Sequence, residues 1–151
     1  MSSDTSIDIR AIIFVNESAE DSYRNLPDEV RQAADARNSA IQNNRRLPRD
    51  QRKSLSGELA GIDEVRISFD GDTYRVYDLI EFNEVIYILD AGMKKSPRGK
   101  EIPQQQVDRL VARRKMARDD YLKNKALYQA EQQSRLQRRK AWEDARNPRP
   151  H

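Results

Sequence analysis

Lysine, arginine and tyrosine are the first candidates for chemistry in this sequence, because it has no cysteine and its only histidine is His151, the last residue. Lysine and arginine neutralise developing negative charge, and lysine or tyrosine with a lowered pKa can move a proton. Strand alternation places Arg66 on the face opposite Val65, and places Arg75 and Tyr77 together on one face of the next strand. Arg66 and Arg75 are therefore candidate site residues.

Further cations flank the strands that carry this pair. Lys94 and Lys95 follow the last strand directly, and a basic connector precedes the first one. The candidate phosphate-binding residues around them are Arg52, Lys53, Tyr77, Arg98 and Lys100. Together these groups predict a basic groove that binds phosphates.

Each candidate also has a structural alternative. Arg75 is either a site residue or a buried arginine paired with an acid such as Glu64 or Glu81. Tyr77 and Tyr87 fit packing on the sheet better than catalysis. An ordinary surface position is the alternative for Arg66, Lys94 and Lys95.

The elements that must position these residues follow the order β-α-α-β-β-β-α. Hydrophobic periodicity predicts a strand over residues 7–15, helices over 18–25 and 28–43, and strands over 65–69, 73–82 and 85–89. Residues 45–61 are expected to be a polar connector, residues 90–93 to leave the sheet, and a helix to run from 103 to 146. We predict an α+β fold: a small antiparallel meander, two N-terminal helices on one face, and a long basic C-terminal helix.

Charge is distributed unevenly along the chain. Residues 1–92 carry 11 Lys/Arg against 18 Asp/Glu, whereas residues 93–140 carry 15 against 5. This asymmetry favours a partner with phosphates or acidic side chains. The apolar stripe of the last helix fades beyond Tyr128, so we expect a domain over 1–128 and a projecting basic tail over 129–151.

Several classes of protein are disfavoured by composition. The sequence has no apolar run of 18 residues, and its N-terminus lacks the basic and apolar segments of a signal peptide. We expect a cytoplasmic protein with no membrane partner. Without cysteine, and with a single terminal histidine, we expect neither a metal site nor another cofactor.

Residues 53–121 resemble the RelE/ParE superfamily of toxins from bacterial type II toxin–antitoxin systems, and most of all its HigB-like, phage-derived branch. Leu26-Pro27-Asp28-Glu29-Val30-Arg31, the start of the second helix, also fits. The matching pieces, in order, are Leu55-x-Gly57; Glu64-Val65-Arg66 with Asp70-Gly71-Asp72-Thr73-Tyr74-Arg75-Val76; Val85-Ile86-Tyr87-Ile88-Leu89 with Lys94-Lys95-Ser96; and Pro103 with the helix that reaches Asp119-Asp120-Tyr121.

The resemblance implies a RelE-like fold and a free or ribosome-associated endoribonuclease that acts on mRNA. It also implies an antitoxin partner, often one with a helix-turn-helix. On this reading the catalytic residues are Arg66, Arg75, Lys94 and Lys95, and the RNA-binding residues are Arg52, Lys53, Tyr77, Arg98 and Lys100.

The sequence departs from these relatives at two places. Leu89-Asp90-Ala91-Gly92 stands where they have Leu-His-Ala-Phe, and the chain runs thirty residues beyond Tyr121. Asp90 could orient Lys94 or Lys95, act as a base, or cap a turn, and we favour the cap.

Two other functions remain open beside the RNA-cleaving toxin. One is a RelE-fold module that binds gyrase, the ribosome or another protein without catalysis, as relatives in the ParE branch inhibit gyrase. The other is a phage accessory protein that has kept the fold. A small neighbouring helix-turn-helix gene would favour a toxin of either kind.

Overall fold

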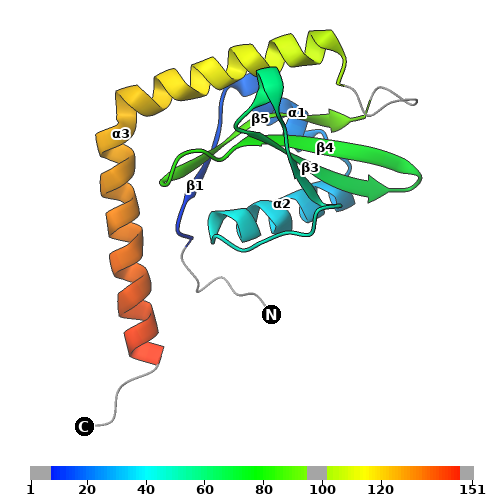
Figure 1. The fold of residues 1–151 in the computed structure, drawn as a ribbon. Helices are drawn as coiled ribbons and strands as arrows, with labels where there is room; N and C mark the ends of the chain where they lie inside the picture. Colours follow the sequence, from blue (N-terminus) through cyan, green and yellow to red (C-terminus); the bar gives the residue numbers. More distant parts are fainter. Residues whose placement is uncertain (1–7, 95–101, 147–151) are drawn as a thin grey trace.

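A five-stranded sheet between two helical layers forms the centre of the protein (Figure 1). The computed structural model describes residues 8–94 and 102–146. The strand order is β1-β5-β4-β3-β2. The strands are β1 (Ala11–Phe14), β2 (Arg52–Ser54), β3 (Ile62–Phe69), β4 (Asp72–Leu79) and β5 (Val85–Met93); the helices are α1 (Glu17–Arg24), α2 (Asp28–Gln42), α3 (Gln104–Arg146) and the short 3-10 helix η1 (Gly57–Leu59).

Strand alternation divides the apolar side chains between two cores. Val65 and Ile67 of β3 belong to the core that α1 and α2 cover, whereas Ile62 of the same strand belongs to the core under α3. The α3 core also contains Leu110 and Ala117 from the helix itself. Both faces of the sheet are thus buried, which is why β5 reads as an almost continuous apolar run.

The predicted α+β class, the antiparallel meander β3-β4-β5 and the two N-terminal helices on one face are confirmed. The sheet, however, is larger than predicted and mixed. β1 pairs in parallel with β5, and β2 lies inside the expected connector, where Lys53 pairs with Glu64. β2 is a short edge strand held by backbone pairing, so its polar sequence carries no apolar alternation.

The prediction that residues 90–93 leave the sheet is wrong, because β5 continues to Met93. Tyr77 pairs with Asp90, whereas the next residue, Asp78, pairs with Ile88. Leu89 is therefore an extra residue on β5 and forms a bulge. As a result, Leu89 and Asp90 both turn toward α3.

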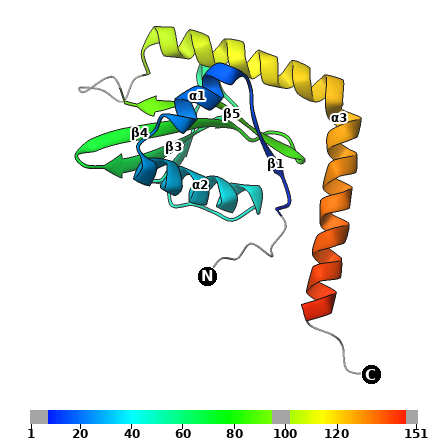
Figure 2. The ribbon, with the colours of Figure 1, turned by 180° about the vertical axis from the view of Figure 1, so that it is seen from behind.

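The predicted C-terminal helix is confirmed as one continuous element, α3, but it bends sharply (Figures 1 and 2). The bend falls in the yellow-to-orange part of the helix. Within α3, Asn124 Nδ2 donates to the Asp120 carbonyl at 3.1 Å, a side-chain bond of the kind that competes with the helical ladder. After the bend the helix runs beside the start of β1.

Two side chains attach the first turns of the expected tail, 129–151, to the sheet. Gln132 Nε2 donates to the Asn83 carbonyl at 2.8 Å, and Arg135 Nη2 donates to the Glu84 carbonyl at 3.3 Å. Residues 147–151 lie outside the described residues. Neither described part of the chain contains a helix long and apolar enough to cross a membrane.

We expect two C-terminal deletions to differ in stability. Deleting residues 137–151 should leave the melting temperature within about 3 °C, because an exposed pair such as Arg139–Glu143 contributes at most about 0.5 kcal/mol. Deleting 129–151 also removes the Gln132 and Arg135 contacts, at about 1 kcal/mol each, and should lower it by several degrees. Thermal circular dichroism measures both. Equal melting temperatures would show that the two contacts contribute nothing to the fold.

Candidate functional site

A cavity of about 180 Å³ opens where the end of β5 meets the first turns of α3. Residues of β4, of β5 and of the start of α3 line it, together with Ser22 of α1. We call it the β5–α3 pocket and define it by Arg75 and Tyr77 from β4, Asp90 and Lys94 from β5 and its exit, and Gln106 and Arg109 from α3.

A shared carboxylate holds the arginines of the neighbouring strands. Glu64, only 2% exposed, accepts from Arg66 Nε at 2.7 Å and lies 3.5 Å from Arg75 Nη1. Arg66 and Arg75 stand directly opposite each other on β3 and β4, so alternation brings all three side chains to one face. The alternative of a buried, Glu64-paired Arg75 is confirmed, and this same arginine lines the pocket.

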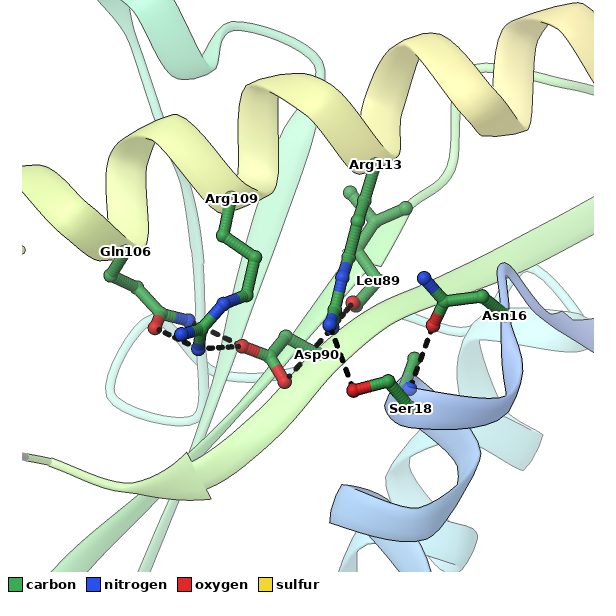
Figure 3. Close-up of polar contacts among 8 residues, drawn as sticks. Asn16, Ser18, Leu89, Asp90, Gln106, Arg109 and Arg113 are labelled. Carbon is green, nitrogen blue, oxygen red and sulfur yellow. Dashed lines mark hydrogen bonds and ion pairs between the residues drawn. The ribbon is translucent and has the colours of Figure 1, made fainter.

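A second buried carboxylate, Asp90, ties β5 to α3 (Figure 3). It accepts from Gln106 Nε2 at 2.7 Å and lies 3.4 Å from Arg109 Nη1 and 3.3 Å from Arg113 Nη1. The preferred interpretation of Asp90 as a turn cap is wrong, because the β5 bulge points its carboxylate at the helix.

Arg113 extends this contact to α1. It donates to the Leu89 carbonyl at 2.8 Å and to Ser18 Oγ at 3.1 Å. Ser18 lies in the first turn of α1, which Asn16 caps by accepting from the Ala19 N–H at 2.8 Å. Arg113 therefore fixes three elements around the pocket, and its role is structural.

The charges around the pocket do not balance. Glu64 forms ion pairs with two arginines, Arg66 and Arg75. Asp90 forms ion pairs with two others, Arg109 and Arg113. Lys94 adds a fifth cation and forms no ion pair within residues 8–94 and 102–146. An excess of cations around a half-enclosed cavity favours an anionic ligand.

Tyr77 stays protonated at neutral pH. Burial raises the pKa of the Tyr77 hydroxyl to about 12, the Glu64 charge acts in the same direction, and Arg75 opposes them. A phenol with such a pKa can donate a hydrogen bond or a proton but cannot serve as a general base. Within residues 8–94 and 102–146, no group of three acidic or histidine side chains could hold a metal ion.

The other predicted site residues are scattered. Arg66 does not line the pocket but binds Glu64, which also pairs with the pocket residue Arg75. Lys53 is exposed and stands opposite Glu64 on the same face of the sheet. Arg52 pairs with Asp63 and stands opposite Val65, so it faces the α1/α2 layer and does not join the pocket. Tyr87 is buried and donates to Asp120 at 2.6 Å, as expected for a packing residue. The predicted residues Lys95, Arg98 and Lys100 lie outside the described residues.

Sequence reasoning missed the contribution of α3 to the pocket. Gln106, Arg109 and Arg113 are spaced by three and four residues, which places them on one helix face beside the apolar stripe. This spacing was the available signal. It became informative only once Asp90 was known to face the same helix.

A protein-family model described as "Phage derived protein Gp49-like (DUF891)" matches residues 21–115. All six residues that define the β5–α3 pocket fall inside this span, whereas the bent second half of α3 lies beyond it. No curated protein matches the chain.

Proposed function

Since the chain belongs to the phage-derived Gp49-like family, we propose that it is the toxin of a type II toxin–antitoxin system. Within the RelE superfamily we assign it to the HigB-like branch. Its activity is the metal-free cleavage of mRNA, either free or on the ribosome.

One observation carries this proposal: a cationic pocket that contains a buried arginine and a protonated tyrosine. Cleavage of RNA requires attack of the 2′-oxygen on phosphorus, stabilisation of the phosphorane oxygens, and protonation of the leaving 5′-oxygen. Arg75 and Lys94 supply positive charge for the phosphorane. Tyr77 donates its proton to the 5′-oxygen, while solvent water takes the proton of the 2′-hydroxyl.

The second candidate is a module that binds RNA or an acidic protein surface without cutting. The favouring observation is that both carboxylates beside the pocket are held by two arginines each, and that Tyr77 is protonated. The described residues thus place no free general base at the pocket. The target would then be gyrase, the ribosome or another protein, in a toxin or in a phage accessory protein.

The experiment that separates the two candidates maps RNA ends. Purified protein is incubated with mRNA, with and without translating ribosomes, and the 5′ and 3′ ends of the products are sequenced. We expect new internal ends, with Tyr77→Phe forming them at least about 100-fold more slowly, as for loss of a general acid. Tyr87→Phe is the matched control, because Tyr87 lies in the core. Unchanged mRNA in all reactions would exclude catalysis and leave the binding module.

We further propose that a small antitoxin, of the helix-turn-helix type, neutralises the protein in the cytoplasm. The basic half of the chain, 15 Lys/Arg against 5 Asp/Glu over residues 93–140, suits an acidic antitoxin segment as well as RNA. Co-expression with the product of a small neighbouring gene, followed by co-purification, tests this. Growth inhibition that no neighbouring gene relieves would count against it.

A further inference from the structure

We propose that the first turns of α3 complete a phosphate-binding subsite in the β5–α3 pocket. Arg109 and Gln106 are its contacts from the helix, and Asp90 is the positioning residue that holds them. The ligand is one phosphodiester group of single-stranded RNA. The inference rests on the proposed function only in taking RNA as the ligand.

The start of α3 lies at the pocket. Pro103, immediately before the helix, lines the cavity, and its carbonyl accepts the N–H groups of Gln106 and Val107 at 2.9 and 3.0 Å. The first two residues of the helix, Gln104 and Gln105, have N–H groups with no partner inside the helix, and these groups form the positive end of the helix dipole. The pocket therefore lies beside the positive end of the helix dipole, which favours an anion there.

Arg75, one of the residues that line the pocket, has an unmade hydrogen bond, which supports the same ligand. The Arg75 side chain is only 7% exposed, and among residues 8–94 and 102–146 its Nε has no hydrogen-bond partner. Within the same residues its one ion pair is with Glu64, at 3.5 Å, so the guanidinium keeps donors that form no hydrogen bond. Buried donors are rarely left unsatisfied, and a phosphate oxygen is a strong acceptor for a guanidinium.

Asp90 gives the helix side of the subsite a fixed geometry (Figure 3). Arg109 is 43% exposed and would otherwise sample many rotamers. It is held by Asp90 Oδ2 at 3.4 Å and by Gln106 Oε1 at 3.1 Å, while Gln106 Nε2 itself donates to Asp90. Since Arg113 fixes Asp90 in turn, Arg109 and Gln106 are held in place before the ligand arrives.

The test measures binding separately from cleavage. A labelled 2′-O-methyl oligouridylate, which cannot be cut, is titrated with the full-length protein at 50–200 mM salt, and binding is read by fluorescence anisotropy. Arg109→Gln should weaken binding about tenfold. The slope of log binding constant against log salt concentration should also become shallower by about 0.7, the contribution of one phosphate contact on a single strand.

Arg114→Gln is the matched control, because it removes the same charge from the same helix. Arg114 donates to the Ala60 carbonyl at 2.8 Å and does not line the pocket. Its binding and salt slope should stay close to those of the wild type. If Arg109→Gln and Arg114→Gln behave alike, Arg109 makes no phosphate contact and the proposal is overturned.

Asp90→Asn distinguishes positioning from simple charge. Removing a negative charge beside the pocket would by itself tighten RNA binding, whereas release of Arg109 weakens it. We expect weaker binding, and no additional loss when Asp90→Asn is combined with Arg109→Gln. Tighter binding by Asp90→Asn would refute the positioning role. A melting curve checks that the variant folds. If it does not, Asp90→Glu, which keeps the charge and displaces the carboxylate, tests the same support of Arg109: it should also weaken binding, and unchanged binding would refute the positioning role.

The outcomes separate this proposal from the proposed function. The wild type and Arg109→Gln could produce new RNA ends equally, with the same salt slope of binding. That result would refute the subsite and support the nuclease. If the variants change binding as predicted but no new RNA ends form, the subsite is supported and the nuclease is refuted.

Discussion

Asp78→Asn should make the protein increasingly more stable than the wild type as the pH rises from 5 to 8. Asp78 is 0% exposed, and neither of its carboxylate oxygens has a hydrogen-bond partner in the part of the chain that the structure describes. Asp63, another acid, stands directly opposite it across β3 and β4. Burial, and then the charge of Asp63, raise the pKa of Asp78 from 3.8 to about 8, with Arg52 opposing.

The sign of the effect follows from linkage. Because the folded-state pKa lies above the unfolded one, the favourable contribution of protonated Asp78 is complete below about pH 4 and is lost as the pH rises toward 8. Across that window the unfolded chain releases a proton that the folded chain keeps. The folding constant of the wild type therefore falls by a factor approaching ten per pH unit. An amide cannot ionise, so the variant lacks this loss.

Urea unfolding at pH 5, 6, 7 and 8 measures the difference between the two proteins. Asp70→Asn is the control, because Asp70 is exposed in a turn with a positive φ of 51° that asparagine also tolerates. Its stability relative to the wild type should not change with pH. Parallel stability curves for Asp78→Asn and the wild type would show that Asp78 is ionised in the folded protein.

Arg66→Ala and Lys94→Ala should each abolish growth inhibition in cells while leaving the melting temperature within a few degrees. Each removes positive charge at or beside the pocket, and loss of one group that stabilises a transition state slows a reaction by about 100- to 1,000-fold. The effect on folding is small, because Glu64 keeps Arg75 as a partner when Arg66 is removed, and half-buried Lys94 forms no ion pair in the described parts of the chain.

Arg75→Ala should behave differently. Unlike Arg66, whose side chain is 31% exposed, Arg75 is only 7% exposed, so its removal empties a buried position beside Glu64 and should destabilise the protein by about 3 kcal/mol. Its loss of growth inhibition would then not by itself report on catalysis. Lys115→Ala is the neutral control, since Lys115 is 77% exposed and pairs with Asp119 on the helix surface. Inducible expression and thermal melting of purified proteins measure both properties. An unfolded Arg66→Ala, or full toxicity of both variants, would contradict the assignment.

Local patterns in the sequence were sufficient for most elements and for the faces of the central strands. The alternation of Val65 and Ile67 with Glu64 and Arg66 assigns one set to the α1/α2 core and the other to the opposite face. Alternation also indicated that Arg66 and Arg75 could converge on one face, and the register of β3 and β4 in the structure places them directly opposite each other. Such patterns work because a strand has a side-chain period of two, which any neighbouring strand must match.

The sequence by itself made arginine, lysine and tyrosine the candidates for chemistry, because it offers no cysteine and only a terminal histidine. Tertiary structure alone decided which of these side chains share a pocket. The β5 bulge turns Asp90 to α3, and α3 then places Arg109 beside Lys94, Arg75 and Tyr77. A bulge depends on the register between two strands, and the place of a helix depends on the core beneath it. Both arise from contacts between residues far apart in the chain, which a local period does not encode.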